Sequence, residues 1–211
     1  MMKTDNLNDI VEAIVAELRK KTSFEIEASA RHIHLDQPTI DALFGAGHQL
    51  TPKRPLSQPG QFVSEERLTL VGPNGKIANV AVLGPARKQS QVELSLTDAR
   101  TLGVTPPLRE SGHLDQTPGV TLVSASGKSV GIESGVIVAQ RHVHMTPSDA
   151  KLYGVKNGDV VDVKMTGDRG LIFGNVVIRV SDRFATRMHV DFDEANACGL
   201  TKGMRGTIYK K

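Results

Sequence analysis

The period of the hydrophobic pattern changes near residue 22. Between Leu7 and Leu18, apolar side chains recur at every third or fourth position, which predicts an amphipathic helix. After Thr22, short alternating and β-branched runs predict strands, and clusters of Gly, Pro, Asn and Asp separate them. The predicted strands cover 24–28, 67–71, 76–83, 91–96, 135–140, 160–165, 171–180 and 187–192. Short helices are predicted over 38–44, 98–102, 147–153 and 193–197. The pattern therefore predicts a mainly β protein.

A weak internal duplication divides the chain. Aligning Asn79-Val80 with Asn175-Val176 sets an offset of 96 residues (175 minus 79), and the similarity continues at this offset. The further positions that it pairs are Arg87 with Arg183, Glu93 with His189, Ala99 with Ala195, and Gly103 with Gly199. Two similar small β domains are the simplest interpretation, and a length of 211 residues allows them.

Composition and charge narrow the class of protein. Apolar residues make up 39% of the chain but aromatic residues only 4%, so Val, Ile, Leu and Ala must fill the core. A net charge of +3 is too small to favour nucleic acid binding, and it is compatible with a small anionic substrate. Cys198 is the only cysteine, so no internal disulfide can form and a reducing, cytoplasmic compartment is expected. A membrane span and a signal peptide are not expected, because no apolar run is long enough and the N-terminus lacks the required pattern.

Two histidine pairs carry most of the chemistry that the sequence offers. The stretches RHIH (31–34) and RHVH (141–144) hold four of the seven histidines. Because side chains alternate along a strand, residues two apart share a face, so each pair presents two imidazoles on one side. Two imidazoles at this spacing can bind one metal ion. The alternative is a polar strand face without a metal, which is the usual meaning of a single His-x-His segment.

The duplication supplies a third ligand for each pair, Glu93 in the first half and His189 in the second. The two predicted sets are His32, His34 and Glu93, and His142, His144 and His189. Three nitrogen and oxygen ligands leave one position open for water or substrate, as in catalytic zinc sites. Other late first-row divalent metals also suit imidazole-rich sets. The alternative for Glu93 is an exposed strand residue.

Three arginines lie close to these segments. Arg87 is in a Gly- and Pro-containing loop that leads to Glu93, where a guanidinium can hold a phosphate with two parallel hydrogen bonds. A solvated loop charge is the alternative. Arg31 and Arg141 precede the histidine pairs on the opposite strand face, so salt bridges or packing against the sheet are expected for them.

A short predicted helix follows each third ligand. The predicted N-caps are Thr97 or Asp98 for the first helix and Asp191 or Asp193 for the second, and Gly103 and Gly199 are the predicted C-caps. The N–H groups at such helix starts can bind anions. Asn196 can hydrogen-bond a ligand or lie on the helix surface, and Cys198 is predicted to pack at the helix end. His48 and His113 lie outside the repeat and are interpreted as surface or loop residues.

The amphipathic segment at residues 7–18 cannot bury its apolar stripe alone. It can pack on the body of its own chain, pair with a second copy of the chain, or serve as a targeting helix for an assembly. The pattern does not separate these alternatives.

Five stretches resemble the PduL-type phosphate propanoyltransferases, the phosphotransacylases of bacterial microcompartments. The stretches are SARHIHL (29–35), LTPKRPLSQPGQ (50–61), residues 68–103, GVIVAQRHVHM (135–145) and MHVDFDEANACG (188–199). The resemblance implies two β-barrel domains with two zinc ions in the cleft between them. It places the first barrel over 30–139 and the second over 140–211, with the strand 22–29 crossing over to the second. Residues 1–21 then resemble the family's encapsulation helix.

The resemblance also assigns residues to substrates. The two ligand sets given above would hold the zinc ions, and Arg87 matches the family's catalytic arginine. Positions that line the coenzyme A site match Ser29, Arg54, Leu83, His189 and Asn196. The implied partners are coenzyme A, phosphate or acyl phosphate, a second copy of the chain in a homodimer, and microcompartment shell or core proteins that contact residues 7–18.

The implied reaction is acyl-CoA + phosphate ⇌ acyl phosphate + CoA, with a propanoyl or acetyl group. We expect the zinc at His32, His34 and Glu93 to receive the CoA sulfur as a thiolate, because a metal-bound thiol is deprotonated. The second zinc and Arg87 would stabilise the phosphoryl oxygens or the acyl carbonyl. Two rival functions remain: a dinuclear metallohydrolase, and a non-enzymatic adaptor of a shell assembly.

Overall fold

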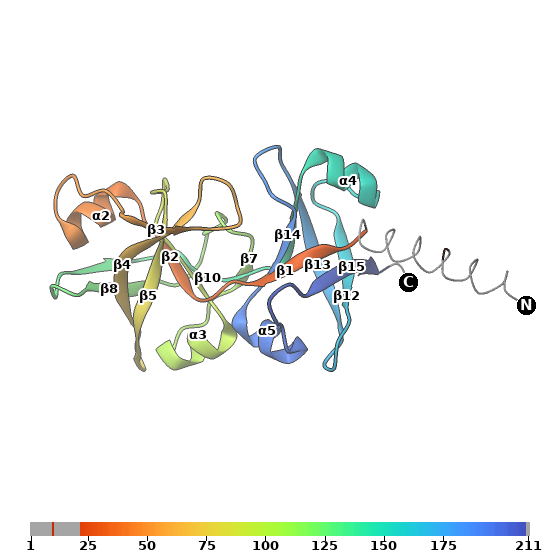
Figure 1. Cartoon of the computed structure of the whole chain (residues 1–211). Coiled ribbons are helices and arrows are strands. Elements are labelled where there is room, and N and C mark those ends of the chain that lie inside the picture. The colour runs from red at the N-terminus through yellow and green to blue at the C-terminus, as the bar shows by residue number, and fades with distance from the viewer. Residues whose placement is uncertain (1–9, 11–21, 210–211) are drawn as a thin grey trace, which may run out of the picture. The chain divides into compact units, whose positions relative to one another are not determined.

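The predicted fold class is confirmed by a computed structural model, which describes residue 10 and residues 22–209 (Figure 1). The protein is mainly β, with 41% of the described residues in strands and 16% in helices, and contains a closed six-stranded barrel and a second, larger sheet. Nearly all of the helix predicted at 7–18 falls outside the described residues. Within the described part of the chain, no helix is long and apolar enough to cross a membrane.

The chain divides into two compact units. Among the described residues, one unit comprises 22–27, 142–188 and 198–209, and the other comprises 28–141 and 189–197. The division passes through two strands of the barrel, between Glu27 and Ala28 and between Met188 and His189, although each strand is continuous. The predicted domain boundaries at 30–139 and 140–211 stay a prediction.

Six strands form the closed barrel in the order β1-β14-β11-β13-β12-β15. Their bounds are β1 Phe24–Ala28, β11 His142–Met145, β12 Val160–Met165, β13 Ile172–Val180, β14 Arg187–Val190 and β15 Arg205–Tyr209. The barrel closes where β1 pairs with β15 in antiparallel register, with Phe24 opposite Gly206. Helix α4 (Pro147–Tyr153) follows β11 and is capped at its start by the Thr146 hydroxyl, which accepts a hydrogen bond from the Asp149 N–H.

Nine strands form the larger sheet in the order β7-β10-β6-β2-β5-β4-β8-β9, with β3 paired to β4. Their bounds are β2 His32–His34, β3 Pro52–Pro55, β4 Phe62–Val71, β5 Lys76–Gly84, β6 Gln91–Leu94, β7 Leu108–Arg109, β8 Val120–Ser124, β9 Ser129–Ile132 and β10 Val136–Ala139. The helices α2 (Gln37–Phe44), α3 (Leu96–Leu102) and α5 (Phe192–Cys198) accompany this unit.

The core of the larger unit follows from alternation along its strands. In β8, VTLVS, every second side chain is buried, and Leu122 is fully inaccessible. Helix α2 adds Ile40 and Leu43 to the same apolar cluster, and α3 adds Leu102. Aliphatic side chains fill this core, as the scarcity of aromatic residues predicted.

The backbone confirms the duplication. Three pairs of elements have equal lengths and lie 96 residues apart: β5 and β13, β6 and β14, and α3 and α5. Asn79 and Asn175 have φ angles of 60° and 56°, a left-handed conformation that Asn tolerates better than most residues. Their strands pair with neighbours whose register shifts, between Leu68 and Leu70 in one unit and between Val161 and Val163 in the other. Each half therefore repeats the same local irregularity.

The helix caps correct one prediction and confirm another. Helix α3 is capped by Ser95 and not by Thr97 or Asp98, since the Ser95 hydroxyl accepts from the Asp98 N–H. Asp98 instead completes a capping box by accepting from the Ser95 N–H. At α5, Asp191 accepts from the Glu194 N–H, as predicted. Gly103 and Gly199 end the two helices with φ angles of 74° and 61°.

Candidate active site

Adjacent strands bring His32, His34 and Glu93 together. Strands β2 and β6 pair in antiparallel register with His32 opposite Glu93, so the side chains of both lie on one face with that of His34. The Nε2 atoms of the two histidines are 3.1 Å apart, and His32 Nε2 is 3.5 Å from Glu93 Oε2. All three residues are buried. The sequence predicted this set, and its Glu93 is not an exposed strand residue.

The spacing of these atoms fits a tetrahedral metal ion. Zinc–nitrogen bonds of about 2.0–2.1 Å place tetrahedral ligands roughly 3.3 Å from each other. The separations of 3.1 Å and 3.5 Å given above lie on either side of this value. The distance from His34 Nε2 to Glu93 Oε1 is 3.9 Å. His32 Nδ1 lies 2.8 Å from the Ala30 carbonyl oxygen, so it can donate its proton there and turn Nε2 toward a metal. The donor set and its spacing therefore suit zinc.

The protonation states of this group also suit a cation. Burial, reinforced by the charges of His32 and Arg87, holds the pKa of His34 well below its ordinary value. Burial lowers the pKa of His32, but the charge and hydrogen bond of Glu93, together with the hydrogen bond to Ala30, raise it above its ordinary value. Burial raises the pKa of Glu93, but the charge and hydrogen bond of His32 prevail and hold it well below the usual range. The buried carboxylate thus favours a positive charge at this position, and a bound metal ion would supply one.

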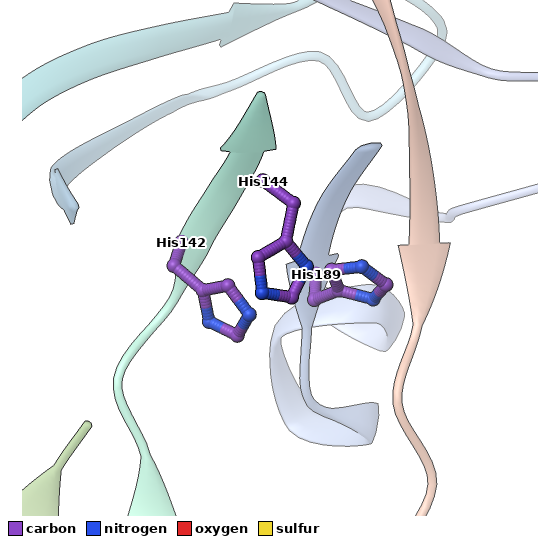
Figure 2. A group of neighbouring side chains, drawn as sticks. All are labelled: His142, His144 and His189. Carbon is purple, nitrogen blue, oxygen red and sulfur yellow. The ribbon is translucent and has the colours of Figure 1, made fainter. Parts of the chain in front are cut away.

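The second set, His142, His144 and His189, lies in the barrel (Figure 2). The first two come from β11 and the third from β14, and their ligand nitrogens lie within 4.8 Å of each other. The rings of His142 and His144 are 4.6 Å apart at 70°, and His144 packs against Phe184. Three imidazoles with no carboxylate make a neutral donor set that suits zinc and other late first-row metals.

Arg87 lies in the loop between β5 and β6 and is half-buried. Its backbone N–H donates to the Leu35 carbonyl, and its Nη1 donates to the Ser111 hydroxyl at 3.0 Å. Its positive charge lowers the pKa of each of His32, His34 and Glu93. The predicted arginine therefore stands beside the first ligand set and is not simply a solvated loop charge.

Two residues near this centre were missed from the sequence. Gln91 hydrogen-bonds to Glu93, and Ser111 hydrogen-bonds to both Gln91 and Arg87. The position of Gln91, two residues before Glu93 on the same strand face, was the available signal. Ser111 lies far from Gln91 and Arg87 in the sequence, so no local pattern indicated its role.

The predicted coenzyme A contacts are spread over several elements and stay predictions. Ser29 follows β1, and its N–H donates to the Val190 carbonyl. Arg54 is exposed on β3, and Leu83 is half-buried on β5. His189 lies 3.4 Å from the amide nitrogen of Gln58. Asn196 is exposed on α5.

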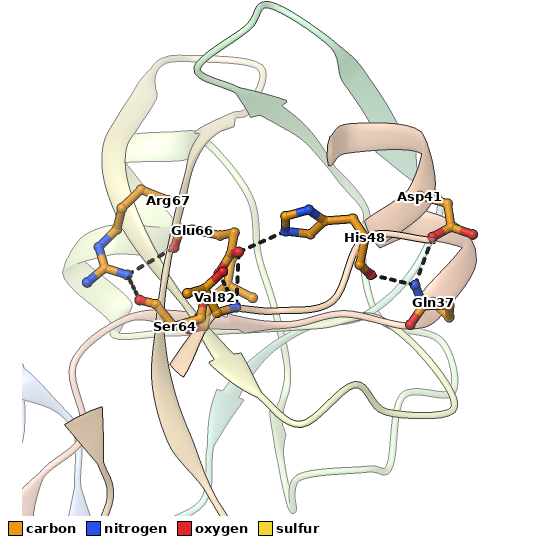
Figure 3. Close-up of polar contacts among 8 residues, drawn as sticks. Gln37, Asp41, His48, Ser64, Glu66, Arg67 and Val82 are labelled. Carbon is orange, nitrogen blue, oxygen red and sulfur yellow. Dashed lines mark hydrogen bonds and ion pairs between the residues drawn. The ribbon is translucent and has the colours of Figure 1, made fainter. Parts of the chain in front are cut away.

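The remaining histidines and the cysteine also have defined surroundings. His48 is in a loop but is not simply a surface residue, because its Nε2 lies 2.8 Å from Glu66 Oε1 (Figure 3). His113 is exposed in a loop, as predicted. Cys198 is 2% exposed at the end of α5, which confirms its predicted packing role.

The arginine of each RHxH segment forms an ion pair with the third residue of the helix after the third ligand. Arg31 Nη1 is 2.6 Å from Asp98 Oδ1, and Arg141 Nε is 2.7 Å from Glu194 Oε1. Each pair joins the residue that precedes two histidines to the helix that follows the third residue of the set. This arrangement confirms the salt bridges expected for both arginines and explains why the arginine recurs in the repeat.

Replacing Asp98 with alanine should destabilise the protein by about 1–3 kcal/mol, because a buried carboxylate that bonds to Arg31 and to the Ser95 N–H is lost. Replacing Arg31 with methionine should cost only about 0–1 kcal/mol, since its side chain is 40% exposed and solvent screens the pair. Urea unfolding of both single variants and the double variant measures the difference. Equal losses for the two single variants would contradict the role of Asp98 in the cap.

Comparison with known proteins identifies the family. A family model described as phosphate propanoyltransferase matches residues 25–201. The chain is 56% identical to the phosphate propanoyltransferase of Enterococcus faecalis over 212 aligned residues, covering 100% of both proteins. The chain belongs to the phosphate propanoyltransferase family. The resemblance seen in the sequence is thereby confirmed, and so is the enzyme class of phosphotransacylase.

Relatives in this family extend across distant bacteria. The phosphate propanoyltransferase of Listeria monocytogenes is 52% identical over 100% of this chain and 98% of its own length. That of Thermotoga maritima is 50% identical over 96% of each chain. In this chain, the family match covers both sets of possible metal ligands, Arg87 and the segments that join them.

Proposed function

We propose that the chain interconverts acyl-CoA and phosphate with acyl phosphate and CoA, and that it holds two zinc ions, one at each ligand set. The observation that carries this proposal is the convergence of His32, His34 and Glu93 beside the anchored guanidinium of Arg87. The family membership supports the transfer of an acyl group to or from phosphate. The metal content and the roles of individual residues are the proposed part.

His32, His34 and Glu93 would hold one ion, and His142, His144 and His189 the other. When bound, zinc lowers the pKa of a thiol or polarises a carbonyl, so it supplies the activation that the CoA sulfur needs. Glu93 contributes the one formal negative charge of the six ligands. It favours binding of a cation while leaving a net positive site for an anionic sulfur.

Arg87 would hold the phosphoryl group. Its guanidinium is planar and always charged, and it can bond two oxygens of one phosphate at once. The bond from its Nη1 to Ser111 fixes the direction of the side chain, so the ordering cost is met before substrate binds. Negative charge that develops on the oxygens of the tetrahedral transition state is then stabilised by a group already in place.

The bond changes are a direct exchange. In the direction of thioester synthesis, the CoA sulfur forms a bond to the acyl carbon, and the bond from that carbon to the phosphate oxygen breaks. The thiol proton leaves to the released phosphate or to water, and no electron is gained or lost overall. No covalent acyl-enzyme is proposed, because Cys198 is buried at the end of α5.

The acyl group is proposed to be propanoyl or acetyl. The two differ by one methylene, which in a binding pocket changes the free energy by only about 1–3 kcal/mol. Ser29, Arg54, Leu83, His189 and Asn196 are proposed to contact CoA. Arg54 is suited to the CoA phosphates by its charge, and Leu83 to an apolar part of the cofactor.

A location inside a bacterial microcompartment is also proposed, with residues 7–18 as the targeting helix. Deleting residues 1–20 should leave acyl transfer unchanged and abolish co-purification with shell proteins. Loss of activity on deletion would instead support packing of this segment on the catalytic body or on a second copy of the chain.

The test of the proposed function is a transacylase assay on protein of measured metal content. Thioester absorbance in the ultraviolet follows the reaction with propanoyl phosphate or acetyl phosphate, with and without CoA. We expect thioester formation only with CoA and only while metal is bound. If acyl phosphate were lost without CoA at the same rate as with CoA, the result would support a metallohydrolase. Full transfer activity in metal-free protein would overturn the zinc proposal.

A further inference from the structure

Gln91 is a buried polar side chain beside the first ligand set. It lies on β6 and is 1% exposed. In the pairing of β2 with β6, Gln91 lies opposite His34 in the same register that places Glu93 opposite His32. A buried amide without partners would cost several kcal/mol, so its hydrogen bonds determine what it does.

The amide of Gln91 bonds in three directions. Its Nε2 donates to Glu93 Oε1 at 2.6 Å and to the Ser111 hydroxyl at 2.8 Å. Its Oε1 accepts from the Gly112 N–H at 2.8 Å. The carboxylate can only accept and the Gly112 N–H can only donate, so the orientation of the amide is fixed by its partners. A carboxylic acid or an apolar residue of the same size cannot make this set of bonds.

These bonds leave the two oxygens of Glu93 in different surroundings. Oε1 is held by Gln91, whereas Oε2 is the oxygen nearer to the Nε2 atom of His32, at 3.5 Å. A hydrogen bond to one oxygen of a carboxylate favours metal binding through the other oxygen, whose lone pairs are both available. Glu93 is thus set up as a ligand with one bonding oxygen, which preserves an open coordination position.

The same amide is also connected to Arg87, the residue proposed to bind phosphate. Ser111 accepts hydrogen bonds from both Gln91 Nε2 and Arg87 Nη1. Gly112, next in sequence, is held by Gln91 Oε1. The chain from Glu93 through Gln91 and Ser111 to Arg87 is therefore continuous within one unit of the protein.

We propose that Gln91 is the positioning residue that couples the metal ligand Glu93 to the Ser111–Gly112 loop and, through Ser111, to Arg87. The proposal rests on the function proposed above for these groups. Gln91 touches neither substrate in this role. It sets the bonding oxygen of Glu93 and the direction of the Arg87 guanidinium with one amide, so it acts on metal affinity and on phosphate binding together.

Gln91→Met tests the proposal, because it keeps the length of the side chain and removes all three hydrogen bonds. We expect zinc affinity at one of the two sites to fall about 10- to 100-fold in chelator competition, as for the loss of other residues that support metal ligands. We expect KM for phosphate to rise about tenfold while KM for CoA stays unchanged. Unchanged zinc affinity and unchanged KM for phosphate in a folded variant would overturn the proposal.

Ser111→Ala separates the two effects and guards against a variant that fails to fold. It keeps the bond between Gln91 and Glu93 and removes both hydrogen bonds to the Ser111 hydroxyl, from Gln91 and from Arg87, so the connection to Arg87 is lost. Zinc affinity should stay at the wild-type value, and KM for phosphate should rise. A fall in zinc affinity as large as that of Gln91→Met would contradict the division of roles along this chain.

Gln37→Met is the matched control (Figure 3). Gln37 also donates two hydrogen bonds from its Nε2, to Asp41 Oδ1 at 2.7 Å and to the His48 carbonyl at 2.9 Å, but it lies on α2. The control should lower the free energy of unfolding without changing zinc affinity or KM. If Gln91→Met changed only the stability, as this control does, Gln91 would be structural and the proposal would fail.

Hydrogen exchange of the metal-free protein distinguishes a failure of this proposal from a failure of the proposed function. The Gly112 amide should exchange faster in Gln91→Met than in wild type, whether or not metal is bound, because its acceptor is lost. If wild type neither binds zinc nor transfers acyl groups, the proposed function fails and the exchange result still decides whether Gln91 holds the loop. An unchanged exchange rate at Gly112 would contradict that role.

Discussion

Replacing His34 with alanine is expected to lower acyl transfer by at least about a thousandfold and to leave one bound zinc ion in place of two. His34 is 3% exposed and supplies one of the nitrogens in the first ligand set. With two protein ligands, a site loses most of its affinity, and the several kcal/mol of transition-state stabilisation that a metal supplies is lost with it. Metal analysis by mass spectrometry and the thioester assay measure the two effects on one sample.

His48→Ala is the matched control for this loss. His48 is in the same unit and pairs with the carboxylate of Glu66, but it belongs to neither ligand set. Its replacement should reduce stability by about 1–2 kcal/mol through the lost hydrogen bond and leave the zinc content at two. Two zinc ions and full activity in His34→Ala would show that the first ligand set is not the catalytic metal site.

Replacing Arg87 with alanine is expected to reduce kcat by about 100- to 1000-fold, the usual effect of removing a group that stabilises charge in a transition state. The zinc content should not change, because Arg87 is not a ligand. Arg87→Lys should recover only a small part of the rate, since an ammonium group keeps the charge but cannot form two parallel bonds to one phosphate. Steady-state kinetics with varied phosphate separates the effect on kcat from that on KM.

Arg183 provides the control, because the repeat pairs it with Arg87. It is exposed after β13, and its backbone N–H donates to the Ser181 hydroxyl. Arg183→Ala should keep the wild-type rate. A similar loss of rate in both variants would mean that Arg87 acts through general charge and not through its position beside His32, His34 and Glu93.

Much of the fold could be predicted from local patterns. The strands 24–28 and 160–165 and the helix 147–153 match β1, β12 and α4 residue for residue, because alternation and capping residues mark them clearly. Both ligand sets were also predictable, since the period of two residues along a strand and the 96-residue offset are properties of the sequence itself.

Other parts depend on contacts that a single sequence does not reveal. Strand β3, PKRP, contains two prolines and was not predicted as a strand, but β4 provides a partner at the sheet edge, where proline is tolerated. The cap at Ser95 was missed because Thr97 and Asp98 carry equally good capping groups. Ser111 lies 18 residues after Glu93, and only the fold brings it to Arg87.

The pairing of β1 with β15 has a consequence for the order of events during synthesis on the ribosome. The larger sheet needs no strand beyond β10, which ends at Ala139, whereas the barrel cannot close until Arg205–Tyr209 has been translated. We therefore expect the cluster of His32, His34 and Glu93 to form in the nascent chain before β15 is available to pair with β1. Until then, the unpaired edge of β1 is open to mispairing with other chains.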